Sequence, residues 1–145
     1  MRRLLYCDSP GFCGSLGMLV LRVVMGAAFM IHGWPKIQNA TSWMGSDSEF
    51  PPALQACAAV AEFGGGAGLI VGFLTPLAAL GIAVTMGVAI AKVHLPAGHP
   101  FVDAQGGHSY ELAAVYLAGA LAILLVGAGR FSVDRCLFGK RAGST

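Results

Sequence analysis

Four long apolar blocks, separated by short polar stretches, run along the chain. They lie at about 15–34, 53–74, 77–95 and 110–129. A block of about 18 or more apolar residues has the length of a helix that crosses a bilayer. The pattern therefore predicts an all-α integral membrane protein, an antiparallel four-helix transmembrane bundle, with residues 1–145 forming a single domain.

Prolines mark the breaks between these predicted helices. Pro35 is expected to end the first helix, and Pro51 and Pro52 to begin the second. Thr75 and Pro76 form a very short turn, with the threonine as an N-cap and the proline in the first turn of the next helix. The second and third helices should therefore form a tight antiparallel hairpin.

Glycines recur at four-residue spacing along the second block, at Gly64, Gly68 and Gly72. Small residues at this spacing let a neighbouring helix approach closely in lipid. We interpret these three glycines as a packing surface.

Composition and charge agree with a membrane protein. The chain is 56% hydrophobic and only 11% charged, whereas roughly 25% of residues are charged in a typical soluble domain. The net charge of +2 comes without a basic run carrying interleaved aromatics, so we expect the lipid bilayer as a partner and no nucleic acid. Arg22 interrupts the first block and no small-residue cleavage site follows it, which favours a retained helix over a signal peptide.

Lysine and arginine set the expected orientation, because they stay on the cytoplasmic side. The two tails hold most of them: Arg2, Arg3, Arg130, Arg135, Lys140 and Arg141. The two long loops, 38–52 and 96–109, together hold only Lys36 at their border. Both termini should therefore be cytoplasmic, with the long loops outside.

Ionisable residues inside the blocks are functional candidates, because each costs at least ~2.5 kcal/mol at the centre of a bilayer. Arg22 and Glu62 are expected at overlapping depths and therefore as neighbours. They form either a salt bridge that fixes helix register or a polar pocket that holds a ligand head group or relays a proton. Lys92 and Glu111 lie near the outer boundary, where an ion pair at the rim is favoured over a binding role.

Histidines occur at a similar outer depth, at His32 on the first predicted helix and His94 on the third. Two histidines on facing helices can ligate a b-type haem, although hydrogen bonding to water or to carboxylates is the commoner role and the one favoured here. His99, Asp103 and His108 offer metal-ligating types, but they lie on no regular element, so solvated loop residues are the better interpretation.

Catalytic motifs are missing from the sequence. Nothing resembles a nucleophile elbow, a phosphate loop or a metalloprotease helix. The four cysteines form no C-x-x-C pair, so no thiol redox centre is predicted; free Cys7 and Cys13 are favoured over a metal site or a disulfide. The chain itself is expected to be non-catalytic, at most a subunit of an oxidoreductase.

Several segments together form an ordered set: Leu21-Arg22, Met25-Gly26, Phe29, His32-Gly33, Lys36, Glu62, Gly64-Gly65, Gly72-Phe73-Leu74-Thr75, Ala91 to His94, Tyr110-Glu111, and Gly127-Ala128-Gly129-Arg130-Phe131-Ser132-Val133-Asp134. This set resembles the DoxX family and covers roughly residues 15–137. Pro76 departs from it, because many members carry an arginine there, which removes one cytoplasmic charge.

The resemblance implies a four-helix protein of the bacterial inner membrane that is associated with redox systems. DoxD and DoxA form a thiosulfate:quinone oxidoreductase, and other relatives partner with thiol or oxidative-stress enzymes. The positions that match the recurrent polar residues of the family are Arg22, His32, Lys36, Glu62, His94 and Glu111. With the neighbouring Lys92, they are the site candidates.

The leading hypothesis is a membrane subunit of a quinone-linked redox assembly, with a polar pocket near the outer leaflet. His32, Lys92 or His94 would hold quinone oxygens, and Glu62 or Glu111 would carry protons. The alternative is a non-catalytic structural or assembly subunit of a larger membrane protein complex. A solute permease fits less well, because the predicted helices are unbroken.

Overall fold

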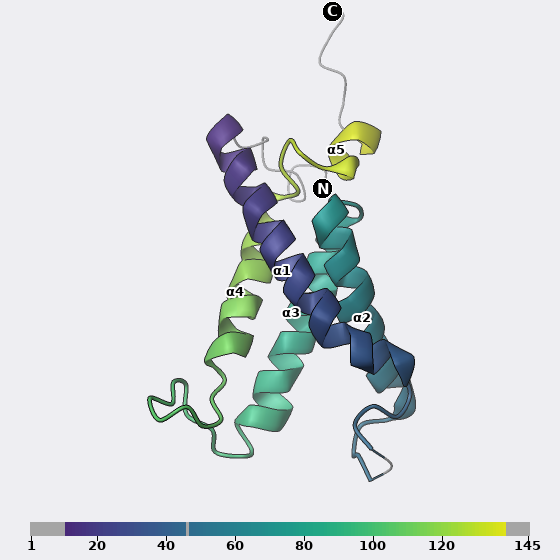
Figure 1. The fold of residues 1–145 in the computed structure, drawn as a ribbon, viewed down its shortest axis with the longest axis vertical. Coiled ribbons are helices and arrows are strands. Elements are labelled where there is room, and N and C mark those ends of the chain that lie inside the picture. Colours follow the sequence, from purple (N-terminus) through teal and green to yellow (C-terminus); the bar gives the residue numbers. More distant parts are fainter. Residues whose placement is uncertain (1–10, 46, 139–145) are drawn as a thin grey trace, which may run out of the picture.

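The structure, a computed structural model, describes residues 11–45 and 47–138, and this part of the chain is helical with no strand. Its elements are α1 (Phe12–Gln38), α2 (Pro52–Val71), α3 (Thr75–Ala89), the π-helical turn η2 (Ile90–His94), α4 (Glu111–Val126) and α5 (Val133–Phe138). Figure 1 shows the start of α1, the α2–α3 turn and α5 at one end of the bundle. The two long loops lie at the opposite end, here called the loop end.

Apolar side chains cover the outside of the bundle. Ile31 is 74% exposed, Leu125 71% and Leu77 64%, which suits a surface in contact with lipid rather than water. Within the described residues, three helices are long and apolar enough to cross a membrane: α1, α2, and α3 together with η2. The fourth, α4, is also apolar but shorter. The protein is thus an all-α integral membrane bundle, as predicted.

The helix boundaries correct several expectations. Pro35 does not end α1, which continues to Gln38. The last turn is held by the pairing of Lys36 with Glu62, described below. α4 ends at Val126 rather than 129, because Gly127 adopts a φ of 87° that breaks the helix. At 1.5 Å per residue α4 is about 24 Å long, less than the ~30 Å of hydrocarbon.

The helix α5 was not expected from the periodicity. Ser132 caps it, because its Oγ accepts a hydrogen bond from the backbone N–H of Arg135 at 3.2 Å. Asp134 in this helix then reaches back to the α2–α3 turn, where its two carboxylate oxygens accept the N–H groups of Leu74 and Thr75, each at 2.8 Å. The hairpin is confirmed, but Asp134, and not the Thr75 side chain, caps α3.

The closest helix crossing joins α1 and α2. A Cβ added to Gly33 would lie 2.6 Å from the backbone nitrogen of Phe63, and one added to Gly26 would lie 2.6 Å from the carbonyl oxygen of Gly66. Gly64, in the predicted stripe, approaches only its own neighbour Val60, at 3.9 Å. Elsewhere in the stripe, a Cβ added to Gly68 would lie 3.5 Å from Cβ of Ala78 on α3, and one added to Gly72 would lie 2.6 Å from Cβ of Ser132. Close packing is therefore found at two of the three predicted glycines, although the α1–α2 crossing itself uses other glycines.

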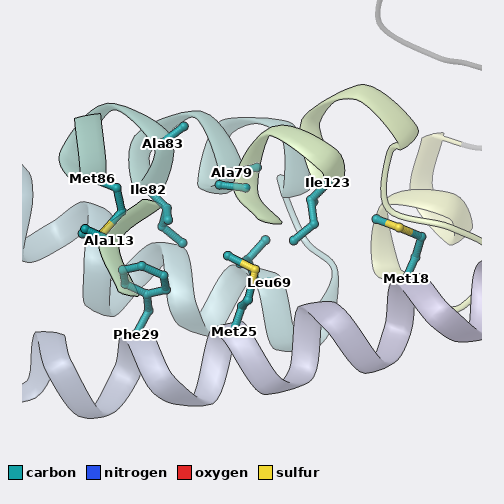
Figure 2. Close-up of a cluster of buried hydrophobic side chains, with 11 residues drawn as sticks. Met18, Met25, Phe29, Leu69, Ala79, Ile82, Ala83, Met86, Ala113 and Ile123 are labelled. Carbon is teal, nitrogen blue, oxygen red and sulfur yellow. The ribbon is translucent and has the colours of Figure 1, made fainter. Parts of the chain in front are cut away.

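A hydrophobic core joins all four long helices (Figure 2). Met25 of α1 lies beside Leu69 of α2, and Phe29 of α1 points toward Ile82 of α3, with Ile123 of α4 on the other side of Leu69. These residues are at most 4% exposed.

A candidate ligand groove between α2 and α3

The central feature of the candidate site is an ion pair between α1 and α2. Nζ of Lys36 lies 2.6 Å from Oε1 of Glu62. Glu62 is 1% exposed, and its second oxygen, Oε2, is buried without a hydrogen-bond partner. A buried polar atom without a partner costs free energy, so a native structure that keeps one needs a reason for it.

An aromatic ring covers the cation of this pair. Nζ of Lys36 lies 4.4 Å from the centroid of the Trp43 ring, within the range of a cation–π interaction. The indole N–H of Trp43 donates to the carbonyl oxygen of Gln55 at 2.9 Å, which fixes the ring. The α1–α2 loop thus contributes directly to the site.

Gln55 anchors this loop on α2. Its side chain is 4% exposed overall, its Oε1 accepts the N–H of Met44 at 3.1 Å, and its Nε2 donates to the carbonyl of Phe50 at 2.9 Å. Satisfied buried amides of this kind hold a segment in one conformation. Gln55 and Trp43 were not among the sequence candidates, and both are essential to the geometry.

A groove of about 530 Å³ runs between α2 and α3 beside the ion pair. This volume falls within the range of small-molecule sites. Its lining is mostly apolar, with Lys36, Trp43, Gln55 and Glu62 supplying the polar and aromatic end. Along α3 and η2 it extends from Leu77 to Val93, about 24 Å of helix axis, which is long enough for a hydrocarbon chain.

Arg22 lies at the opposite end of the bundle, so the expected Arg22–Glu62 pairing is wrong. The Arg22 guanidinium donates through Nη1 to the carbonyl of Ala128 and through Nη2 to that of Phe131 at 2.6 Å. Asp134 acts on it electrostatically. The depths were misjudged because α1 is longer than predicted: Gly33 packs on Phe63, which places Lys36 beside Glu62 and leaves Arg22 about 21 Å away along α1.

The outer histidines do not gather around the ion pair. His32 is exposed and its ring lies 6.4 Å from that of Tyr116 on α4. His94, at the end of η2, places Nδ1 3.0 Å from Nδ1 of His99, whose ring stacks on that of His108 at 5.2 Å. The described residues contain no group of three or more His, Cys, Asp or Glu side chains arranged to hold a metal ion.

Lys92 and Glu111 are both exposed and, within the parts of the chain that the structure describes, they form no ion pair with each other. The predicted rim pair is therefore absent. Of the seven sequence candidates, the structure brings together Lys36 and Glu62. Cys13, Cys57 and Cys136 are free and exposed, and Cys57 lines the groove; Cys7 lies outside the described residues.

Comparison with known proteins assigns the chain to a family. Residues 17–95 match the DoxX family, and residues 57–144 match the family described as "TQO small subunit DoxD". The chain is 28% identical to the inner membrane protein YqjF of Escherichia coli, over 85% of this chain and 93% of that protein. It is 26% identical to an uncharacterised protein of Haemophilus influenzae, over 88% of this chain and 87% of that one.

No solved structure matches the chain significantly. The DoxX match alone covers more than half of the 145 residues and includes both Lys36 and Glu62. Together with the helical membrane bundle that the sequence folds into, these matches show that the chain belongs to the DoxX family.

Proposed function

We propose that this protein is the membrane subunit of a quinone-linked redox assembly, and that the α2–α3 groove binds the quinone. One observation carries the proposal: the buried Oε2 of Glu62 has no partner and belongs to the lining of an otherwise apolar groove. A lipophilic molecule with a hydroxyl-bearing ring, such as a quinol, fits such a site, because its tail lies against the walls and a ring hydroxyl donates the missing hydrogen bond to Oε2.

The ion pair offers both kinds of group that a quinone and its quinol need. The ammonium of Lys36 donates hydrogen bonds, which suits a quinone carbonyl, and the Oε2 atom of Glu62 accepts one, which suits a quinol hydroxyl. Glu62 would hold or release the proton at Oε2. Amino acid side chains of these types carry no electrons by themselves, so a redox partner protein would supply or remove them.

The comparisons with known proteins support a role as a membrane subunit. The name of the DoxD family describes its members as a small subunit, and the relative from Escherichia coli is named an inner membrane protein. We therefore propose a bacterial inner membrane as the location of this chain, and the gathering of Lys and Arg in its two tails supports cytoplasmic termini. The loop end of the bundle, and with it the ion pair, would then lie toward the outer leaflet.

Quinone binding can be measured on the purified protein in mild detergent through the fluorescence of Trp43, which lines the groove. Trp34→Phe removes the second tryptophan of the chain. A short-chain quinone should quench the remaining fluorescence, and Glu62→Gln should weaken its affinity by roughly 5- to 150-fold, the equivalent of about 1–3 kcal/mol. Glu111→Gln is the matched control, because Glu111 is exposed and outside the groove lining.

The alternative, an assembly subunit, rests on the apolar faces of α1 and α4. Residues such as Ile31 and Leu125 are suited to pack against another membrane chain as well as against lipid. If the protein copurifies with partner chains but neither contains nor binds a quinone, and Glu62→Gln changes no turnover of the complex, this alternative replaces the quinone proposal. A Soret band that disappears in His32→Ala would instead indicate a haem.

A further inference from the structure

A second cavity adjoins the Lys36 and Trp43 side chains. It measures about 410 Å³ and is lined by Pro35, Lys36, Asn39, Ser42 and Trp43. Asn39 and Ser42 are exposed at the loop end of the bundle. We call this space the outer cavity, because it lies at the loop end of the bundle, where the end of α1 and the following loop line it.

The outer cavity and the groove share two lining residues, Lys36 and Trp43. The Trp43 N–H already donates to the carbonyl of Gln55, so the indole offers no free donor and contributes only its apolar ring to the two linings. Lys36 is different, because its ammonium carries three donors. One of them reaches Glu62 at 2.6 Å, while the side chain remains 24% exposed against 2% for that of Glu62.

We infer that Lys36 is a proton gate that connects Glu62 in the groove with the solution at the loop end. In the inward step, Oε1 of Glu62 takes a proton from Nζ of Lys36, and the neutral amine then takes a proton from water in the outer cavity. The outward step is the reverse. The first transfer converts an ion pair into two neutral groups, so the net charge between the helices stays the same.

No other basic side chain lines either space, so Lys36 is the residue there that can pass protons to Glu62. The linings of the two spaces contain no charged side chain besides Lys36 and Glu62, and the remaining ionisable side chain there is the Cys57 thiol. The gate deepens the proposed quinone function, since it would exchange the protons of a quinol. Its operation, however, needs no quinone, so each idea can fail without the other.

A pH jump without added quinone tests the gate. In Trp34→Phe, the Trp43 ring, 4.4 Å from Nζ of Lys36, should report the titration of the pair as a fluorescence change that Glu62→Gln abolishes. Lys36→Arg is the informative variant, because arginine keeps the charge and the ion pair but does not deprotonate in proteins. The exchange rate should fall at least ten-fold in Lys36→Arg, with thermal stability close to that of the parent.

A block of the outer cavity tests the route separately. In a background without native cysteines, Ser42→Cys modified with a bulky charged maleimide should slow the exchange at least ten-fold. Thr41→Cys, modified in the same way, should not, because Thr41 is exposed and lines neither space. The inference is overturned if no fluorescence transition depends on Glu62, or if the rate is unchanged in Lys36→Arg or in modified Ser42→Cys.

Discussion

Glu62 on α2 pairs with Lys36, which lies near the end of α1. It does not pair with Arg22, the other basic residue of α1. Glu62 itself is close to the middle of α2, which runs from Pro52 to Val71. The long side chain of Lys36 therefore brings a cation from the loop end to the depth of a buried carboxylate. This arrangement gives the pair access to both the groove and the outer cavity.

Removal of one partner of this pair should destabilise the bundle more than removal of both. Lys36→Met leaves the Glu62 carboxylate buried without a counter-charge, which should cost about 1–3 kcal/mol, and adding Glu62→Gln should recover much of that loss. Thermal unfolding in detergent measures the effect. A cycle between Arg22→Ala and Glu62→Ala should instead be additive within about 0.5 kcal/mol, because these residues share no partner.

A methyl group added at Gly33, in the α1–α2 crossing, should destabilise the bundle, whereas one added at Gly64, outside the crossing, should be tolerated. Gly33→Ala would place Cβ 2.6 Å from the backbone nitrogen of Phe63, so the helices must move apart, at a cost of about 1–3 kcal/mol. Gly64→Ala is the control, since the nearest atom there is 3.9 Å away on Val60, and it should be neutral or slightly stabilising. Equal unfolding temperatures for the two variants would contradict the close crossing.

The four long helices, their order and the family could be predicted from the sequence, because long apolar blocks are a strong local signal in length and hydrophobicity. The hairpin at Thr75 and Pro76 was also readable from local turn chemistry. The end of α1 was not, since Pro35 locally favours termination and the contact of Lys36 with Glu62 on α2 is a tertiary interaction without a local signal. One misplaced boundary then shifted every depth estimate along that helix.

The sequence indicated that Glu62 and Lys36 belong to the candidate site, but not that they pair with each other. A low-dielectric interior requires Glu62 to have a counter-charge, yet three basic residues competed for it: Arg22, Lys36 and Lys92. Helix tilt and crossing decided among them, and neither can be read from periodicity. Trp43 and Gln55 were missed because a tryptophan in a loop and a glutamine in an apolar helix carry no motif, although a buried amide inside a membrane span is itself a usable signal.

Asp134 should control the stability of the end where α5 lies. Asp134→Ala leaves the N–H groups of Leu74 and Thr75 without their acceptor and removes the negative charge beside Arg22. We expect a loss of about 1–3 kcal/mol and faster hydrogen exchange at those two amides, measured by mass spectrometry. Val133→Ala, an exposed neighbour on the same short helix, should change neither. Unaltered exchange in Asp134→Ala would show that the cap does not hold the turn.

The orientation of the bundle fixes which solution reaches the outer cavity, and it can be tested by cysteine labelling in intact cells. Lysine and arginine gather at the α5 end, at Arg130 and Arg135 among others, while the loops at the opposite end lack them. This bias predicts the α5 end in the cytoplasm.

Cysteines introduced singly at Asn39 and Gln105, both exposed loop positions, should react with a membrane-impermeant maleimide added outside. The native Cys136, exposed on α5, should react only after the membrane is permeabilised. The opposite labelling pattern would invert the topology and connect Lys36 with the cytoplasm, so that any proton released from the groove would return to the inside of the cell.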